Sequence, residues 1–480
     1  MGKFLKRLLL KEDPNVYQVK DAHLSQVLTV KDFLALGVGT IVSTSIFTLP
    51  GVVAATHAGP AVVISFLLAA VVAGLVAFAY AEMSSVMPFA GSAYSWINVV
   101  FGEFFAWIAG WALLAEYFIA VAFVASGISA NFRGLVEPLG VNFPKQLANA
   151  FGTEGGIIDL VAMVVVLIVA ILLSRGVSGA ARVENILVVL KVLAIILFVI
   201  VGMTALHKAN YSPFIPKYHL NADGSAFGGW QGIYAGISAI FLSYIGFDSI
   251  AANSAEAKDP QKTMPRGILG SLLIAVVLFV VVSLVIVGMF KYTNYANNAE
   301  PIGWALRQSG HPIVATVVQT IAVVGMFTAL IGMMLAGSRL LYSFGRDGML
   351  PKWLGKLNKD KLPNNATLTL STIGIVIGAL FPFAFLAQLI SAGTLIAFMF
   401  VSVGIYAVRS REGKDLPKPS FKMPFYPVLP ALAFLGAFGV FWGLGNDAKL
   451  YALLWFFIGL IIYFAYGIRN SYLGKKNKEN

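Results

Sequence analysis

Three hydroxyl residues, Ser43, Thr44 and Ser45, interrupt the first long apolar segment of the chain just after two glycines. If the helix unwinds here, a second half-helix starts near Ile46, and its free N–H groups and positive dipole end face an anion such as a carboxylate. The hydroxyls would add hydrogen bonds to the same anion. The alternative is a kinked but continuous helix whose hydroxyls bond back to preceding carbonyls.

A second interruption surrounds Gly246 in the later half of the chain. If the helix opens at this glycine, the carbonyl groups of Phe241, Leu242 and Ser243 become free to accept hydrogen bonds from an ammonium group. Asp248 stands where the following half-helix would begin, and we interpret it as an N-cap rather than as a group that contacts a ligand.

The two interruptions are informative as a pair. Unpaired backbone groups are costly against lipid, so a helix that breaks at membrane depth must line a cavity enclosed by protein. Breaks in corresponding segments of two halves are typical of a solute-binding site near the bilayer midplane. The sequence therefore predicts one site formed by both breaks.

Lys191 is the only charged residue between Glu184 and Leu206. A lysine in the middle of a spanning helix costs about 2.5–3.5 kcal/mol, so its side chain should face the bundle interior. Burial disfavours the charged form, and the ammonium group could gain and lose a proton as the cavity opens to either side. We predict a role in proton coupling, with a permanently paired structural lysine as the alternative.

Glu116 is similarly isolated, between Glu103 and Arg133. It could relay protons, bind the amine of a substrate or tie helices together, and the sequence does not separate these roles. Met333 lies in a methionine-containing segment, where its adaptable thioether could shape a side-chain pocket or pack in the core.

The elements that position these residues must be membrane helices. The chain has 480 residues, of which 58% are hydrophobic and 12% charged, and its mean hydropathy is +0.82. Soluble domains carry about 25% charged residues, so the composition indicates an integral membrane protein. Apolar segments that match a hydrocarbon core about 30 Å thick predict twelve spanning helices, at residues 33-55, 60-83, 104-130, 156-174, 183-206, 229-256, 266-290, 313-342, 366-382, 387-408, 426-444 and 450-468.

The net charge of +12 indicates topology rather than nucleic-acid binding. Most of the 34 Lys and Arg residues fall on the side of the predicted bundle that holds both termini, which places the termini in the cytoplasm by the positive-inside rule. The sequence has no cysteine, scattered histidines and no Walker-type loop, so we expect no metal site, no cofactor apart from a coupling proton and no ATP-driven step. An enzyme is a poor hypothesis, because no nucleophile–base pair is evident.

The order of the segments predicts an inverted repeat. With five spans in each half, the interrupted first and sixth segments have opposite orientations, which suits a five-plus-five arrangement. We predict a cytoplasmic N-terminal segment at 1-32, a ten-helix core at 33-408, two additional helices at 409-468 and a basic cytoplasmic tail at 469-480.

Three motifs give the chain a family resemblance. Residues 39–47 are similar to the pattern G-A-I-I-G-T-G-I-F, residues 244–265 are similar to a sixth helix and its exit loop, and residues 339–351 resemble the segment after an eighth helix. Together, and over essentially the whole chain, they resemble the amino acid-polyamine-organocation superfamily in its cationic amino acid transporter branch. Ser43 and Ser45 replace two glycines of the first pattern. This variant is most similar to bacterial branched-chain amino acid permeases.

The resemblance implies the LeuT-type fold, with discontinuous first and sixth helices, and the uptake of α-amino acids. It also implies backbone contacts to the substrate, with the carboxylate at Ile41, Thr44 and Ser45 and the amine at the carbonyls of Leu242, Ser243 and Ile245.

The resemblance extends to the isolated charges. Lys191 matches a fifth-helix lysine that occupies the place of a sodium ion in sodium-coupled relatives, which implies proton symport. Glu116 matches a third-helix glutamate of this branch, and Met333 falls at a pocket position of the eighth helix.

We hypothesise that the protein takes up neutral branched-chain amino acids (leucine, isoleucine and valine, with methionine as a further candidate) with protons across a bacterial cytoplasmic membrane. The second hypothesis is a cationic or broad-specificity permease or exchanger, in which Glu116 meets the substrate amine. A channel or a substrate sensor is a hypothesis of a different class, although a continuous pore would need more polar lining. The sequence leaves the oligomeric state open.

Overall fold

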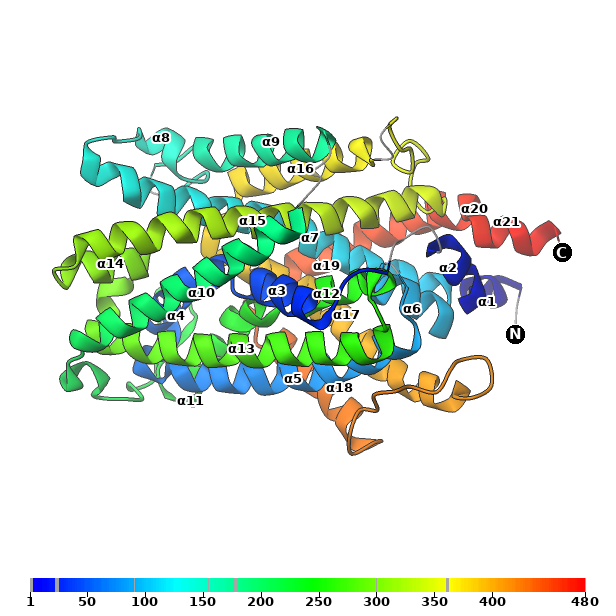
Figure 1. Cartoon of the computed structure of the whole chain (residues 1–480), viewed down its shortest axis with the longest axis horizontal. Helices are drawn as coiled ribbons and strands as arrows, with labels where there is room; N and C mark the ends of the chain where they lie inside the picture. The colour runs from blue at the N-terminus through cyan, green and yellow to red at the C-terminus, as the bar shows by residue number, and fades with distance from the viewer. Residues whose placement is uncertain are drawn as a thin grey trace.

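Helices make up almost the whole structure, a computed structural model that describes residues 3–21, 26–89, 91–153, 155–175, 180–298, 300–359 and 362–479. They lie alongside one another in an elongated bundle (Figure 1). Eight helical segments of the described chain are long and apolar enough to cross a membrane, and three further apolar helices are shorter. The predicted all-helical membrane fold is confirmed at this level.

Helices occupy all twelve predicted apolar segments, because a helix satisfies every backbone group within its own segment. The uninterrupted ones are α5 (Val62–Val86), α7 (Glu103–Val136), α9 (Leu160–Arg175), α10 (Ala180–Thr204), α13 (Pro260–Met289), α15 (Pro312–Arg346), α16 (Asn364–Leu380), α17 (Phe383–Arg411), α18 (Val428–Trp442) and α19 (Asn446–Ile462). Short helices lie between these and at the ends of the chain, namely α1 (Lys3–Leu8), α2 (Pro14–Asp21), α6 (Ala93–Val100), α8 (Lys145–Ala148), α14 (Pro301–Gln308), α20 (Ile468–Asn470) and α21 (Tyr472–Glu479). A small hairpin joins β1 (His219–Leu220) to β2 (Ala226–Phe227).

Two of the predicted segments are broken. The first consists of α3 (Val30–Ile41) and α4 (Thr44–Val53), and the second of α11 (Gly229–Ile240), the 3₁₀ turn η5 (Phe241–Tyr244) and α12 (Phe247–Ala252).

The central helix of the bundle is α7, which packs against α6, α9, α15, α16 and α17. Glycines allow these helices to approach closely. A Cβ on Gly110 of α7 would lie 2.5 Å from the ring of Phe344 in α15, and one on Gly337 of α15 would lie 2.8 Å from Cβ of Tyr117 in α7. This packing holds Glu116 in the middle of the bundle, where it has no exposed surface.

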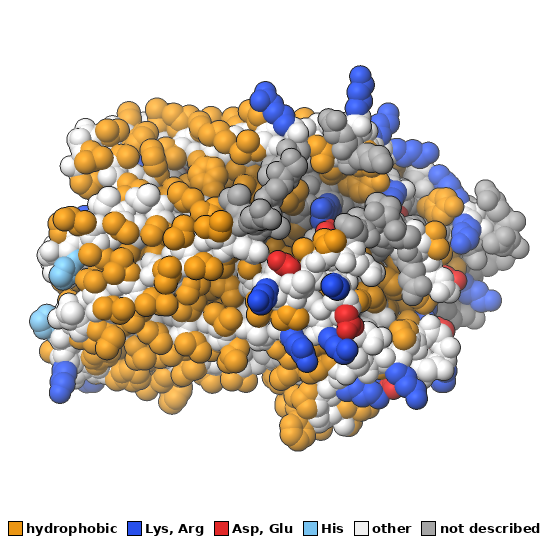
Figure 2. Space-filling view, in the orientation of Figure 1, with side chains coloured by type: hydrophobic (Ala, Val, Ile, Leu, Met, Phe, Trp, Pro, Cys, Tyr) orange, Lys and Arg blue, Asp and Glu red, His pale blue; other side chains and the backbone are white. Residues whose placement is uncertain are grey.

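The two ends of the bundle differ in charge. The N-terminal and C-terminal helices lie at the same end (Figure 1). Lys and Arg side chains gather toward this end, and hydrophobic side chains cover most of the remaining face in Figure 2. Outer helices also expose large apolar side chains, among them Ile171, Leu193, Leu273 and Leu453, as expected of a lipid-facing surface. The prediction that the termini share one side is confirmed.

Candidate functional site

The first break is a true interruption of the helix. Val42 has φ −84° and ψ 70°, and Ser43 has φ −109° and ψ −135°, so neither residue is helical. The alternative of a continuous kinked helix is therefore wrong. The second half-helix starts at Thr44, two residues before the predicted Ile46, because Ser43 takes the non-helical N-cap position that serine favours.

The second break is centred on Gly246, as predicted. Helix α11 tightens into η5, Ile245 is extended with ψ 140°, and Gly246 has φ 138°, a conformation that L side chains rarely adopt. Asp248 lies in the first turn of α12, and its Oδ1 accepts a hydrogen bond from the N–H of Gly246 at 3.0 Å. The prediction that Asp248 is the N-cap is therefore wrong, because Gly246 takes that position and Asp248 lies two residues later, where its carboxylate accepts from the N–H of the N-cap residue.

The two breaks pack against each other. A Cβ on Gly246 would lie 2.9 Å from Cγ1 of Ile41 and 3.0 Å from its backbone nitrogen. Near this contact, the Ser249 hydroxyl donates to Oγ1 of Thr40 at 3.3 Å. The structure therefore brings together two segments that are far apart in the chain, and all the predicted break residues are buried, namely Ile41, Ser43, Thr44, Ser45, Phe241, Leu242, Ser243 and Ile245.

Each break carries a buried hydroxyl group without a hydrogen-bond partner. These are Oγ1 of Thr44 and Oγ of Ser243, and both residues have no exposed surface. A buried polar group left unpaired costs about 1–3 kcal/mol, so most such groups in folded proteins are paired. With the free N–H groups at the start of α4, the Thr44 hydroxyl can bind a carboxylate. The Ser243 hydroxyl can bind an ammonium group.

Lys191 reaches the first break from α10. Its Nζ donates to the carbonyl oxygens of Gly39 and Val42, each at 2.9 Å. The side chain is fully buried, and a Cβ on Gly325 of α15 would lie 2.9 Å from its Cε. The prediction that Lys191 faces the bundle interior is confirmed. The ammonium group satisfies carbonyls at the end of α3 that have no partner within the helix.

Glu116 reaches the second break from α7. One of its carboxylate oxygens, Oε2, accepts a hydrogen bond from Thr394 of α17 at 2.6 Å, and the other, Oε1, is buried without a hydrogen-bond partner. The next residue of α7, Tyr117, donates from its hydroxyl to Asp248 Oδ2 at 3.4 Å. The sequence gave no sign of these contacts, because helix periodicity does not determine which residues of distant helices face each other.

Met333 is buried in α15, a helix that contacts α3, α4, α7 and α12. It lies one turn before Gly337 on the same helix face, and Gly337 packs against Tyr117. This position places Met333 on the α15 face that is directed toward α7.

Aromatic side chains fill the interior between the second break and α6. The ring of Phe247 lies 5.3 Å from that of Tyr80 and is stacked on Phe398 at 5.1 Å, and Trp96 of α6 lies 5.4 Å from Tyr80. Sequence reasoning missed this aromatic cluster, because its members come from α5, α6, α12 and α17 and share no local motif.

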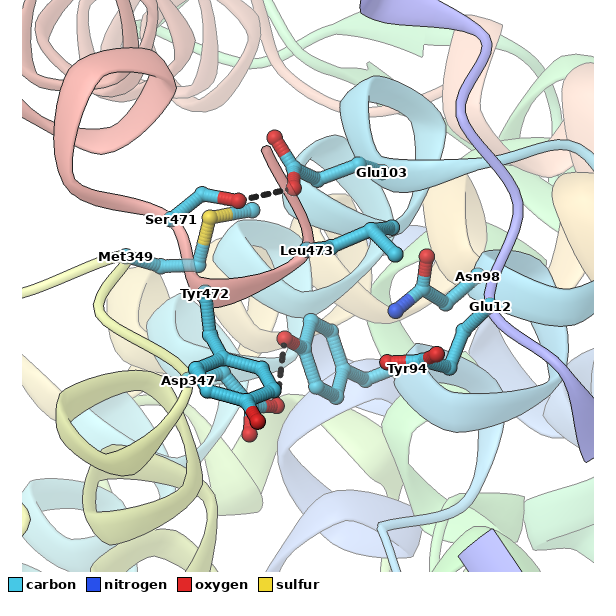
Figure 3. Close-up of a pocket in the computed structure, with 9 residues that line it drawn as sticks. All are labelled: Glu12, Tyr94, Asn98, Glu103, Asp347, Met349, Ser471, Tyr472 and Leu473. Carbon is cyan, nitrogen blue, oxygen red and sulfur yellow. Dashed lines mark hydrogen bonds between the residues drawn. The ribbon is translucent and has the colours of Figure 1, made fainter. Parts of the chain in front are cut away.

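Two hollows lie away from both breaks. One is at the end of the bundle that carries the termini, and Figure 3 shows the residues that line it: Glu12, Tyr94, Asn98, Glu103, Asp347, Met349, Ser471, Tyr472 and Leu473. Within it, the Tyr94 hydroxyl donates to Asp347 Oδ2 at 3.1 Å, and Ser471 donates to Glu103. The other hollow lies between α7, α9 and α16. Among the described residues, no group of three or more His, Cys, Asp or Glu side chains could hold a metal ion.

Two helix breaks that contact each other and carry buried unpaired hydroxyls are typical of a solute transporter in the membrane, not of a soluble binding protein. The family of this chain follows from comparison with known proteins. The family model described as amino acid permease matches residues 28–466, and the chain belongs to this family. The resemblance to amino acid transporters is thereby confirmed.

Three relatives are similar over most of the chain. The branched-chain amino acid permease BcaP of Lactococcus lactis subsp. cremoris is 67% identical over 96% of this chain and 98% of its own length. The methylthioribose transporter of Bacillus subtilis is 35% identical over 95% of this chain and 97% of its own. The vacuolar cationic amino acid transporter 4 of Arabidopsis thaliana is 33% identical over 83% of this chain and 65% of its own.

Proposed function

We propose that this protein is a secondary active transporter that takes up neutral branched-chain amino acids together with protons by alternating access. The observation that carries the proposal is the pair of unpaired, fully buried hydroxyls of Thr44 and Ser243 on two breaks that contact each other. The amino and carboxylate groups of an α-amino acid supply the donors and acceptors that these groups lack.

The substrate lies between the two breaks. Its carboxylate is bound at the start of α4, and its ammonium group is bound by carbonyls of η5 and the residue after it. The residues proposed for these contacts are Ile41, Ser43, Thr44 and Ser45 for the carboxylate, and Phe241, Leu242, Ser243 and Ile245 for the ammonium group. The substrate side chain points toward Met333, where an apolar thioether suits leucine, isoleucine, valine and methionine.

Branched-chain specificity is supported by the name of the relative with 67% identity, a branched-chain amino acid permease. A cationic substrate is supported by more distant relatives such as the vacuolar cationic amino acid transporter. The branched-chain substrate is preferred because the branched-chain permease is much more similar to this chain, over nearly the full length of both chains.

Protons are the proposed coupling ion, and no other cofactor is required. Lys191 holds the carbonyl oxygens of Gly39 and Val42, and these bonds require hydrogens on its nitrogen. Loss of a proton weakens both hydrogen bonds and destabilises the first break, whereas protonation stabilises it. Lys191 thereby couples proton movement to the shape of the substrate site, and Glu116 does the same at the second break.

The proposed architecture has twelve spanning helices in a bacterial cytoplasmic membrane, with a LeuT-type five-plus-five inverted repeat at 33-408. Two further helices follow at 409-468. The segments at 1-32 and 469-480 are cytoplasmic, which the gathering of Lys and Arg near the terminal helices supports. Residues 1, 2, 22–25 and 480 of these segments lie outside the described residues.

Uptake into proteoliposomes tests the proposal. We expect saturable counterflow of labelled leucine that unlabelled leucine inhibits and arginine does not, and accumulation of leucine when an inward proton gradient is imposed. Competition by arginine alone would favour the cationic permease. Non-saturable flux would indicate a channel, and binding without flux a sensor.

Variants in the same uptake assay test whether Thr44 belongs to the substrate site. Thr44→Val removes the unpaired hydroxyl with little change of shape, and we expect a raised KM for leucine. The matched control is Thr372→Val in α16, whose exposed hydroxyl bonds within its own helix to Leu368. An equal effect of both variants would remove Thr44 from the substrate site.

A further inference from the structure

Helix α7 meets the first break at a glycine. A Cβ on Gly127 of α7 would lie 2.0 Å from Cγ2 of Thr44, 2.9 Å from its Oγ1 and 3.1 Å from its Cβ. Both residues are buried, and Thr44 has no exposed surface. Only a glycine lets a backbone approach a side chain this closely, so the main chain of α7 lies directly against Thr44.

The methyl group of Thr44 is the part of the side chain that fills this contact. Its carbon, Cγ2, is the atom nearest to the position that a Cβ on Gly127 would take. The side chain of threonine is stiff about χ1 because two heavy atoms branch from its Cβ, and these two atoms turn together. With the methyl group packed on Gly127, the direction of the hydroxyl group is therefore determined as well.

The contact leaves the hydroxyl group available to a ligand. Oγ1 of Thr44 is buried and has no hydrogen-bond partner in the part of the chain that the structure describes. The carbonyl oxygen of Gly127 accepts from Nδ2 of Asn131 at 2.9 Å, in addition to the helix N–H one turn later. A carbonyl oxygen has two lone pairs, so these two donors satisfy it without Thr44.

The helix break explains why Thr44 needs an external residue to orient it. A threonine inside a continuous helix can donate back to the carbonyl four residues earlier, as Thr372 does to Leu368 at 2.9 Å. Thr44 is the first residue of α4, and the residue four positions earlier belongs to α3 on the other side of the non-helical Val42 and Ser43. The packing of Gly127 on the methyl group takes the place of that bond.

We propose that Gly127 is a positioning residue that directs the Thr44 hydroxyl toward the carboxylate of the substrate. The inference deepens the proposed function and rests on it for the identity of the ligand. A larger residue at position 127 displaces the methyl group and turns the hydroxyl away from the carboxylate. Loss of the methyl group leaves the hydroxyl free to rotate. Both changes weaken binding of the carboxylate but not of the ammonium group or the apolar side chain.

Binding of leucine and of leucinamide to the purified full-length protein tests this role. Leucinamide keeps the ammonium group and the side chain but lacks the carboxylate. The affinity of each follows from the rise of Tm in detergent with ligand concentration, without any transport. We expect Gly127→Ala to weaken leucine binding by about tenfold, as for the loss of one hydrogen bond to a charged group, and to change leucinamide binding much less.

The Thr44→Ser substitution removes Cγ2 and keeps the hydroxyl group. On its own it should lower the preference for leucine over leucinamide, because the hydroxyl is no longer oriented. In the Thr44→Ser background, Gly127→Ala should cause much less further loss, since the atom 2.0 Å from the added Cβ is gone. The control Gly110→Ala places a Cβ 2.5 Å from the Phe344 ring instead, so it should lower the Tm and leave the preference unchanged.

Two results would overturn the positioning role. An unchanged preference in Thr44→Ser would show that the methyl group does not orient the hydroxyl, and this result does not depend on whether Gly127→Ala folds. Equal losses from Gly127→Ala with and without Thr44→Ser would show that the glycine acts through packing elsewhere. Absence of leucine flux, or flux that a proton gradient does not drive, would instead refute the proposed function, and the binding series would still decide the role of Gly127.

Discussion

Glu300 is a buried carboxylate at the end of the bundle opposite the termini, just before α14 (Figure 1). It is paired with Arg307 of α14 and also bonded by Gln319 of α15, and Arg307 donates to Gln319 Oε1 at 2.7 Å. The carboxylate side chain is 15% exposed. Burial, opposed by Arg307 and aided by nearby Glu137, raises the pKa of Glu300 from 4.5 to about 7.

The direction of the pH effect follows from proton binding. Between pH 4.5 and about 7 the folded protein binds more protons at Glu300 than the unfolded chain does. The free energy of unfolding therefore falls as the pH rises through this window, and the contribution of Glu300 is fully present only below about pH 4.5. At about 1.4 kcal/mol per pH unit, the whole change is on the order of 3 kcal/mol.

The Glu300→Gln substitution removes this titration and keeps an amide that can bond with Arg307 and Gln319. Thermal unfolding of the protein in detergent, followed from acidic to slightly alkaline pH, measures the effect. We expect the Tm difference between Glu300→Gln and wild type to change across the window in favour of the variant at high pH. The control Glu412→Gln removes a partly exposed carboxylate whose hydrogen bond from Lys422 lowers its pKa from 4.5, so it should give no such change in this window.

Parallel pH profiles for the wild-type protein and Glu300→Gln would refute the reasoning. So would a wild-type advantage that grows as the pH rises, since that result would mean that the ion pair with Arg307 outweighs the cost of burying the carboxylate.

Three further predictions concern the transport core. Lys191→Ala leaves the carbonyls of Gly39 and Val42 without their donor, so proton-driven leucine accumulation should be lost, and full retention of pH-gradient dependence would contradict the coupling role. Met333→Ser places a small polar group at the proposed side-chain pocket, so the ranking of substrates by size in counterflow should change. An unchanged ranking would remove this residue from the pocket. Gly246→Ala forces a side chain into a backbone with φ 138°, so it should destabilise the protein by about 1–3 kcal/mol, measured as a lower Tm than that of wild type.

The positions of the two breaks could be predicted from sequence because their causes are local. Hydroxyl residues compete with the helix backbone for hydrogen bonds, and glycine alone readily adopts the backbone angles found at Gly246. The start of α4 was misplaced by two residues because both Ser43 and Ser45 are plausible N-caps, and only the observed backbone distinguishes them. The isolation of Lys191 in an apolar segment also sufficed to predict that it points inward.

The partners of the buried charges could not be predicted in the same way. The contact of Glu116 with Thr394 depends on the rotation of α7 and α17 about their axes, and that of Glu300 with Gln319 depends on how the segment before α14 returns to α15. Hydropathy determines which segments are buried but leaves these rotations open when nearly the whole helix surface is apolar. In α7 the buried residues occur around the whole helix circumference, so no polar face indicates its orientation.

Lys191 is matched in sign to the helix end that it contacts. It binds carbonyls at the C-terminal end of α3, where the helix dipole is negative. A carboxylate at this position would face the carbonyl oxygens instead, which is unfavourable, so the first break determines the sign of the charge that can be buried beside it. In the proposed mechanism, a proton lost from Lys191 would change the charge at a helix end that also forms the proposed substrate site, and this shared location would allow protonation and substrate binding to influence each other.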